Sequence, residues 1–122
     1  MTADRLRIAV VGGGIGGLFA AKALLASGHD VGVYEQAPAL GEIGAGVFVT
    51  PNSVRQMARL GLGPAVEAYG ARVGPSSCYR RQDGSRIAGV QVADAAGWNA
   101  AFGMHRADFV EFLAASLPAG VV

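Results

Sequence analysis

The hydrophobic positions near the N-terminus change period between two short apolar runs. Leu6–Val11 is apolar, partly β-branched and followed by glycine, which predicts a buried strand. Over Gly14–Ser27 the apolar residues follow a helical spacing, and Gly28 provides the stop. Asp30–Tyr34 then predicts a second strand. A strand, a helix and a strand in this order form a βαβ unit, for which we expect parallel strands and a right-handed crossover.

A second glycine-rich stretch follows the second predicted strand. Gly41–Gly46 contains three glycines and an alanine, and the apolar residues around it distinguish it from a flexible polar linker. Glycine this dense indicates a backbone that something approaches closely. Thr50 is then suited to a helix N-cap and Pro51 to the first helical position. We therefore expect a helix that ends at Gly61 and a further short helix at Gly63–Tyr69.

The pattern next becomes that of strands. Ser77–Gln82 and Ser85–Val92 flank Asp83-Gly84, a dipeptide favoured in tight hairpin turns. We expect these two strands to be antiparallel and to be followed by a loop at Ala93–Ala101.

The end of the chain returns to a helical spacing. Phe102–His105 predicts a strand and Arg106–Leu117 predicts a helix, whose inward-facing residues would be Phe109, Phe112 and Leu113. Together the elements predict an α/β fold, with a Rossmann-like βαβ unit and a small antiparallel hairpin in a domain that is incomplete.

Composition narrows the class of protein. The 122 residues amount to one domain at most, and 52% of them are hydrophobic while only 16% are charged. The mean hydropathy of +0.37 is apolar for a small domain. The 10 basic and 9 acidic residues are scattered singly, with a net charge of +1. Without a basic patch, we expect neither nucleic acid nor a membrane surface as a partner.

The N-terminus has the outline of a secretory signal, because a basic stretch precedes an uncharged run. That run, residues 8–21, is too short to span a bilayer, and five of its residues are glycine, which weakens a helix. We therefore do not expect a signal peptide. A single cysteine, Cys78, excludes an internal disulfide and fits a reducing compartment, so we expect a cytoplasmic protein.

The first glycine cluster has the spacing G-x-G-x-x-G at Gly12, Gly14 and Gly17, between a predicted strand and a predicted helix. In that context Gly12 makes the tight turn, Gly14 lets the backbone approach a pyrophosphate, and Gly17 lets the helix pack on the strand. The helix N-terminus offers N–H groups and a partial positive charge to the phosphates. Glu35, at the end of the second strand, can accept hydrogen bonds from both ribose hydroxyls and would repel a 2′-phosphate. A dinucleotide site is indicated, and the pattern alone does not separate NAD from FAD.

Four stretches extend this interpretation to a family. The segments "VVGGGIGGLFAAKAL", "VYEQ", "EIGAGVFVTPNSVRQMARLGL" and "MHRADFVEFLAASLP" closely resemble the N-terminal part of the FAD-dependent aromatic hydroxylases. This flavoprotein monooxygenase family includes salicylate and hydroxybenzoate hydroxylases. The resemblance covers nearly the whole chain and is weakest between Val73 and Asn99.

The resemblance implies an extended FAD, with its adenosine at Glu35 and its pyrophosphate over Gly12–Gly17. The segment Gly44–Val49 would pass alongside the flavin, and Arg106 would reach the cofactor from the start of the late helix. NADH or NADPH would be the co-substrate. No residue is assigned to catalysis or to a metal. The expected cofactor-binding residues are Gly12, Gly14, Ile15, Gly16, Gly17, Glu35, Gln36, Gly46, Val47, Phe48 and Arg106.

Two positions depart from the family pattern. Gly41 stands where relatives often have an arginine, so one contact to flavin or phosphate would be missing. Phe48 stands where some relatives have a histidine near the substrate. Phe48 cannot transfer protons, so we assign it to packing or ring contact only. His29 and His105 are lone histidines that we expect to be structural or on the surface.

The family's later motifs indicate what this chain lacks. A Gly-Asp pair that holds the ribityl chain does not occur, and Asp83-Gly84 lies in the wrong context for the family's middle motif. We therefore expect an N-terminal fragment, with an FAD-binding part at residues 1–72, the start of a substrate domain at 73–101 and a return to the FAD-binding domain at 102–122. Its partners would be a small aromatic substrate and the missing C-terminal portion, with self-association possible when that portion is absent.

The resemblance implies hydroxylation of a phenol-like or aromatic-acid ring with NAD(P)H and O₂. Two alternatives stay open at this point. One is an FAD-dependent oxidase or reductase of the same fold without oxygen insertion, and the other is a non-catalytic nucleotide-binding module.

Overall fold

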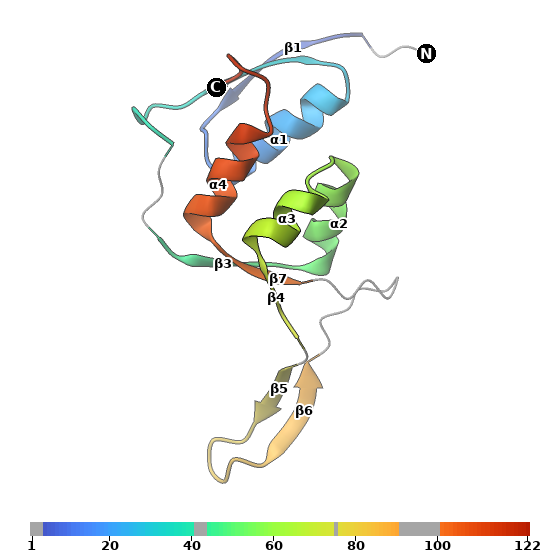
Figure 1. Ribbon diagram of the computed structural model, residues 1–122, viewed down its shortest axis with the longest axis vertical. Helices are drawn as coiled ribbons and strands as arrows, with labels where there is room; N and C mark the ends of the chain where they lie inside the picture. Colours follow the sequence, from blue (N-terminus) through green and yellow to red (C-terminus); the bar gives the residue numbers. More distant parts are fainter. Residues whose placement is uncertain (1–3, 41–43, 75, 91–100) are drawn as a thin grey trace. The chain divides into compact units, whose positions relative to one another are not determined.

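A computed structural model describes residues 4–40, 44–74, 76–90 and 101–122 (Figure 1). The chain divides into two compact units. The first unit comprises Met1–Gly46 and His105–Val122, and the second comprises Val47–Met104.

The first unit contains the predicted βαβ motif. Strand β1 (Arg7–Val11) leads through helix α1 (Ile15–Ala26) to strand β2 (Asp30–Tyr34). The two strands are parallel, with Arg7 opposite Asp30 and Val11 opposite Tyr34. Gly28, at φ +89°, ends the helical turn before β2, as predicted.

The two faces of this sheet differ. Val31 and Val33 of β2 are buried, whereas Tyr34 is 62% exposed and Val11 of β1 is 88% exposed. This alternation follows the period of two along a strand. One face of the sheet is thus covered and the other is open, which is unusual for parallel strands, because they are normally covered on both faces.

Helix α4 (Arg106–Ala115) packs against α1 in the same unit. Its C-terminal end is tied to α1, because Lys22 Nζ donates to the carbonyl oxygen of Ser116 at 2.8 Å. A cation at this place satisfies one of the carbonyls that a helix end leaves unpaired. Beyond α4, the carbonyl oxygen of Val121 accepts from Val33 N at 2.6 Å, beside β2. The buried residues of α1 and α4 are Leu18, Ala21, Phe109, Val110, Phe112 and Leu113.

The second unit contains a three-stranded sheet in the order β3–β7–β4. Its strands are β3 (Gly46–Val49), β4 (Ala71–Arg72) and β7 (Phe102–His105). Strand β3 begins at the last residue of the glycine-rich stretch, and neither β3 nor β4 was predicted as a strand. The first residue of β3, Gly46, and the last residue of β7, His105, belong to the first unit.

Helices α2 (Pro51–Arg59) and α3 (Gly63–Tyr69) of this unit pack against each other. Thr50 is the N-cap of α2 and Pro51 its first residue, as predicted. Gly61, at φ +76°, lies between the two helices. The core of the unit is formed by Val49, Val54, Met57, Leu62, Val66, Phe102 and Met104.

The predicted hairpin is present, but its two strands stop further from the turn than expected. Strand β5 (Ser76–Tyr79) pairs antiparallel with β6 (Arg86–Val90). The prediction of a tight turn formed by Asp83-Gly84 alone is therefore wrong. Instead, Gly84 N donates to the carbonyl oxygen of Arg80 at 2.9 Å, with Gly84 at φ +70°. Asp83 stabilises this wider turn by accepting from Ser85 N and Ser85 Oγ. The predicted loop at 93–101 lies almost wholly outside the described residues.

Candidate cofactor-binding site

The loop that follows β1, Gly12–Gly17, is the first glycine loop. Gly12 has φ +103°, in the region that residues with a side chain rarely adopt. Its N–H donates to the carbonyl oxygen of Tyr34 at 2.8 Å, so the turn begins where the β1–β2 ladder ends. This is the tight turn that the sequence predicts for Gly12.

Gly17 and Gly16 differ in the space around them. A Cβ on Gly17 would lie 1.9 Å from the carbonyl oxygen of Gly12 and 3.4 Å from Val10 Cγ1. Helix α1 therefore packs closely on the turn, as predicted for Gly17. A Cβ on Gly16 would meet no atom within 4 Å, so its surface is open.

Helix α1 begins directly after Gly14 of the glycine loop. Gly14 is the N-cap, in an extended conformation, and no side chain caps it in the structure as described. The first turn, which begins with the half-buried Ile15, carries no acidic residue. The first N–H groups of a helix lack intrahelical acceptors and carry a partial positive charge, so this end suits a phosphate.

Glu35 follows β2 and faces the same loop. Its Oε2 accepts from Gly13 N at 2.6 Å, and its Oε1 accepts from Ala37 N at 2.8 Å. Hydrogen bonds from the backbone N–H groups of Ala37 and Gly13 hold the pKa of the Glu35 carboxyl below its ordinary value. The side chain is therefore a carboxylate at neutral pH, with lone pairs left for a ligand.

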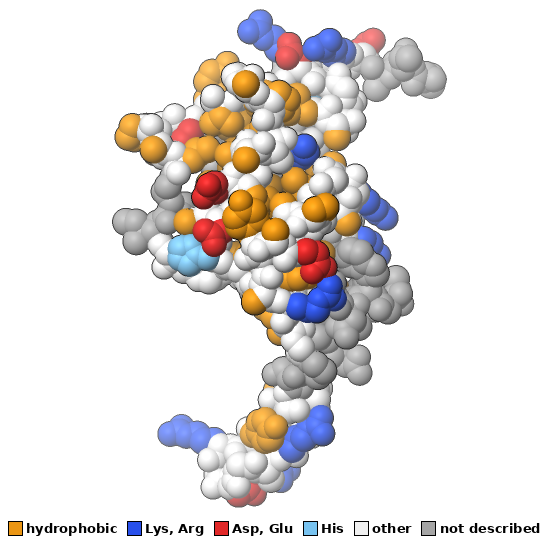
Figure 2. Space-filling model, in the orientation of Figure 1, with side chains coloured by type: hydrophobic (Ala, Val, Ile, Leu, Met, Phe, Trp, Pro, Cys, Tyr) orange, Lys and Arg blue, Asp and Glu red, His pale blue; other side chains and the backbone are white. Residues whose placement is uncertain are grey.

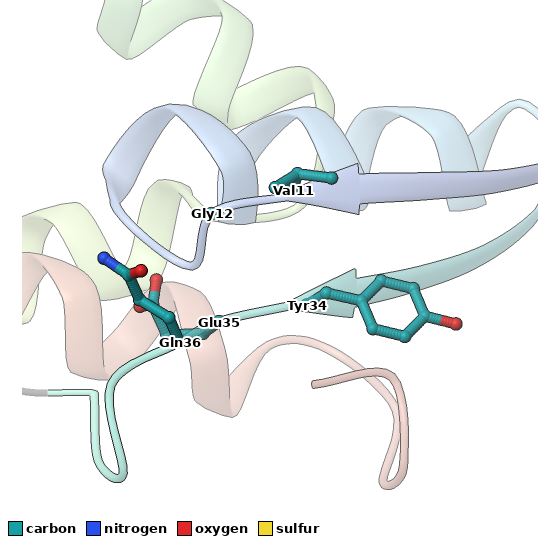
Figure 3. Close-up of a pocket in the computed structure, with 5 residues that line it drawn as sticks. All are labelled: Val11, Gly12, Tyr34, Glu35 and Gln36. Atoms are coloured by element: carbon teal, nitrogen blue, oxygen red, sulfur yellow. The ribbon is translucent and has the colours of Figure 1, made fainter.

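A hollow of about 480 Å³ lies beside this carboxylate, lined by Val11, Gly12, Tyr34, Glu35 and Gln36 (Figure 3). Figure 3 shows the side chains of Glu35 and Gln36 on the side of the glycine loop, whereas the Tyr34 ring lies back along β2. The ring lies over Gly32, where an added Cβ would be 3.4 Å from Tyr34 Cε2. Apolar walls with a carboxylate at one edge fit a nucleoside, which has a flat base and a diol.

A smaller hollow of about 180 Å³ also borders Glu35. The glycine loop contributes Gly13 and Gly14 to its wall, and α4 contributes Val110. The segment after β2 contributes Ala37, Ala39 and Leu40.

The second glycine segment, Gly44–Gly46, meets the start of α4. Arg106 N donates to the carbonyl oxygen of Ala45 at 3.0 Å. A Cβ on Gly44 would lie 2.7 Å from Nε2 of His105. The histidine is exposed, in agreement with a surface role, and its contact with Gly44 could not be foreseen from the sequence. The close neighbour of Gly44 is therefore a residue of this chain, His105.

The remaining predicted site residues are divided between the units. Arg106 and Gly46 belong to the first unit, together with the glycine loop and Glu35, whereas Val47 and Phe48 belong to the second. Phe48 is 56% exposed. Gly41 lies outside the described residues. The structure places Glu35 beside the glycine loop and the backbone of Arg106 beside Ala45, and the cofactor-binding roles of all the predicted residues stay predictions.

The described residues contain neither a metal-binding cluster nor a membrane-crossing helix. Among them, no three His, Cys, Asp or Glu side chains are grouped so that they could hold a metal ion. No helix in the described ranges is both long enough and apolar enough to cross a membrane.

Comparison with known proteins supports a nucleotide-binding fold. A family model described as an NAD(P)-binding Rossmann-like domain matches residues 10–47. The matched region includes the first glycine loop, Glu35 and the second glycine segment.

Curated relatives extend the similarity over most of the chain. The 6-hydroxynicotinate 3-monooxygenase of Pseudomonas fluorescens is 40% identical over 121 residues, which cover 95% of this chain and 31% of that protein. A salicylate hydroxylase of Pseudomonas putida is 38% identical over 122 residues, which cover 95% of this chain and 27% of that protein. This chain therefore spans less than a third of the length of these relatives.

Solved structures give the same result for the fold. HpxO of Klebsiella pneumoniae, in a complex with FAD and uric acid, matches with a TM-score of 0.69 and 30% identity, covering 93% of this chain and 28% of that one. A 2-methyl-3-hydroxypyridine-5-carboxylic acid oxygenase matches with a TM-score of 0.75 at 24% identity, covering 93% and 29%. The resemblance found in the sequence is confirmed: over nearly its whole length, this chain is similar to the N-terminal part of the FAD-dependent aromatic hydroxylases.

Proposed function

We propose that this chain is the FAD-binding, N-terminal portion of a flavin-dependent monooxygenase. The longer enzyme would hydroxylate a small phenol-like or aromatic-acid substrate with NAD(P)H and O₂. The observation that carries the proposal is the meeting of three features in the first unit: the turn at Gly12, the uncapped N-terminus of α1 and the Glu35 carboxylate beside an open hollow.

These residues fit a dinucleotide. The open surface at Gly16 leaves room for a pyrophosphate against the backbone, and the first N–H groups of α1 would hold its oxygens. The Glu35 carboxylate would accept from the ribose hydroxyls, and Val11, Tyr34 and Gln36 would border the adenosine. Bound FAD would supply the redox and oxygen chemistry, while this chain binds and orients it.

The second glycine segment and α4 would hold the other end of the cofactor. Arg106 begins α4, and its backbone N–H bonds the carbonyl oxygen of Ala45, so the residue stands beside Gly44–Gly46. A guanidinium at a helix N-terminus faces a like partial charge, and an acceptor-rich ligand would offset that repulsion. Gly46, Val47 and Phe48 would line the path of the flavin.

The open face of the β1–β2 sheet supports the proposal that the natural protein is longer. Val11 and Tyr34 expose most of their surface there, and hydrophobic side chains reach the surface elsewhere as well (orange in Figure 2). The relatives are more than three times as long as this chain. We propose that a further part of the same polypeptide covers this face, and that residues 1–122 alone associate with one another instead.

The compartment follows from the proposed co-substrate. NADH and NADPH are cytoplasmic reductants, and the lone exposed Cys78 forms no disulfide within the chain. We therefore propose a cytoplasmic enzyme. The division into an FAD-binding part at 1–72, a substrate part at 73–101 and a returning segment at 102–122 belongs to the same proposal.

The test uses the full-length protein. It should purify with a flavin absorption spectrum, and a panel of hydroxylated benzoates and pyridine carboxylates should include one that accelerates NADH or NADPH oxidation. Product analysis under ¹⁸O₂ should find one labelled oxygen, in a new hydroxyl group on the aromatic ring.

Other outcomes would point to the two alternatives. Flavin turnover without labelled product indicates an oxidase or reductase of the same fold. Nucleotide binding without any turnover over the panel indicates a binding module. A colourless protein with no affinity for FAD would overturn the proposal.

A second experiment tests the proposed covering of the sheet. Residues 1–122 expressed alone should be self-associated and colourless in size-exclusion chromatography with light scattering. A monomeric, cooperatively folding and FAD-loaded chain of 122 residues would show that no further part is needed.

A further inference from the structure

We propose that Glu35 is a positioning residue, which ties the first glycine loop to the segment leaving β2 before any ligand is bound. Each of its two carboxylate oxygens accepts one backbone hydrogen bond. Oε2 accepts from Gly13 N at 2.6 Å and Oε1 accepts from Ala37 N at 2.8 Å. We call Gly13, Glu35, Ala37 and Leu40 the Glu35 clasp.

The clasp joins parts of the chain that no ladder joins. The last bond between the loop and β2 runs from Gly12 N to the carbonyl oxygen of Tyr34, at 2.8 Å. Beyond that point β1 turns into the glycine loop and β2 into the segment at Gln36–Leu40. The Glu35 side chain spans this opening, with one backbone N–H from each side. Hydrogen bonds to a charged acceptor are stronger than neutral ones, so both segments are held at the edge of the hollow.

Gly13 supplies an independent observation. It occupies a variable position of the G-x-G-x-x-G pattern, so the motif does not explain why it is glycine. In the structure it is buried, and an added Cβ would lie 2.8 Å from Leu40 Cδ2 and 3.1 Å from Glu35 Cβ. A side chain there would push Glu35 and Leu40 away. Glycine at position 13 therefore leaves Glu35 and Leu40 in the positions that the clasp uses.

The clasp changes how the N–H groups of the loop are used. Gly13 N–H already donates to Glu35, so the groups left for a phosphate begin further along, toward the first turn of α1. The ligand would then reach only the remaining lone pairs of the carboxylate. This division rests on the proposed function for the identity of the ligand, but the clasp itself requires none.

Hydrogen–deuterium exchange on the ligand-free, full-length protein tests the clasp. In the wild type, the amides of Gly13 and Ala37 should be protected. In Glu35→Ala both acceptors are lost, and exchange at both amides should rise about tenfold, as expected for losing a charged hydrogen bond. Glu35→Gln keeps the shape of the side chain but only one acceptor oxygen, so exchange should rise mainly at one of the two. Glu111→Gln removes an exposed carboxylate from α4 in the same unit and should change neither amide.

Gly13→Ala provides the reciprocal variant. It leaves the carboxylate intact but displaces it, so it should also increase exchange at Ala37. If Glu35→Ala does not fold, the isosteric Glu35→Gln decides. If neither variant folds, amide exchange of the wild type tests the clasp, because unprotected Gly13 and Ala37 amides in the ligand-free protein exclude it.

The outcomes separate the clasp from the proposed function. Unchanged exchange in Glu35→Ala together with weaker FAD binding would overturn the clasp and leave the FAD site standing. Increased exchange in a protein that never binds FAD would overturn the function and leave the clasp standing.

Discussion

A methyl group on Gly17 would lie 1.9 Å from the carbonyl oxygen of Gly12, well inside any permitted contact. That oxygen belongs to the backbone of a turn whose φ of +103° already restricts it to glycine. The turn and the start of α1 are therefore packed directly against each other, with no side chain between them. The closeness of α1 brings its N-terminal N–H groups to the end of β1, where the proposed pyrophosphate would lie.

The first prediction compares two glycines of this loop. Gly17→Ala should destabilise the protein by roughly 1–3 kcal/mol, because α1 must move away from the turn. Gly16→Ala should be neutral or slightly stabilising, since a Cβ there meets no atom within 4 Å and alanine favours a helix. Thermal or urea denaturation measures both.

FAD titration of the same pair then tests the ligand. Gly16→Ala should weaken FAD binding despite an intact fold, because the new methyl group occupies the surface proposed for the pyrophosphate. Equal FAD affinity in Gly16→Ala and wild type would remove Gly16 from the site.

The second prediction concerns the pH dependence of stability. The pKa of Glu35 is lowered in the folded protein by backbone hydrogen bonds from Ala37 and Gly13. Its contribution to stability is thus fully present above the unfolded pKa of about 4.3, and is lost as the pH falls through the lower, folded pKa. The described residues that line the two hollows beside Glu35 include no other carboxylate and no histidine.

Wild type and Glu35→Gln should therefore differ most in melting temperature near neutral pH and converge as the pH falls through the lowered pKa of the folded protein. Asp83 also has a lowered pKa, caused by the Ser85 hydroxyl and backbone N–H, but it is common to both proteins and cancels in the difference. A difference that grows toward low pH would contradict the assignment.

The third prediction concerns Arg106. Its backbone bond to Ala45 survives any substitution except proline, so Arg106→Ala should retain the fold while losing the guanidinium. We expect lower FAD occupancy in the full-length enzyme and only partial recovery in Arg106→Lys, because lysine cannot form a bidentate contact. The control is Arg59→Ala, which removes an exposed guanidinium that bonds the Gln56 side chain in the other unit. Full occupancy in Arg106→Ala would exclude Arg106 from the site.

The fourth prediction concerns the contact between Gly44 and His105. Gly44→Ala should displace the imidazole, whose Nε2 lies 2.7 Å from the added Cβ, and cost up to about 1 kcal/mol because an exposed ring can rotate away. In the double variant Gly44→Ala with His105→Ala this cost should disappear. A double-mutant cycle of unfolding free energies measures the coupling. Additive effects would mean that the two residues do not constrain each other.

Much of the first unit could be predicted from the sequence, because its signals are local. Strand β2 begins and ends where the apolar pattern predicts, and β1 and α1 each differ from prediction by a residue at one or both ends. Gly28, and Gly61 in the second unit, adopt the positive φ expected of helix stops. A change from a period of two to a helical period, and a glycine at a turn, are properties of a few neighbouring residues.

Pairing between distant segments could not be predicted in this way. The short strands β3 and β4 exist because β7 lies between them, and β7 follows β4 by some thirty residues. The wider turn of the hairpin depends on where Asp83 directs its carboxylate. A strand of two residues carries no periodic signal, so only its partner defines it.

The chemistry of the site divides in the same manner. The glycine spacing and the acidic residue after β2 sufficed to indicate a dinucleotide, because each residue type is required by the ligand. The tertiary structure alone decided three contacts. Glu35 accepts from Gly13 N and Ala37 N. Gly44 lies against His105, and Arg106 N donates to Ala45. These contacts join residues far apart in the chain, or depend on where one side chain turns, and the sequence pattern contains neither.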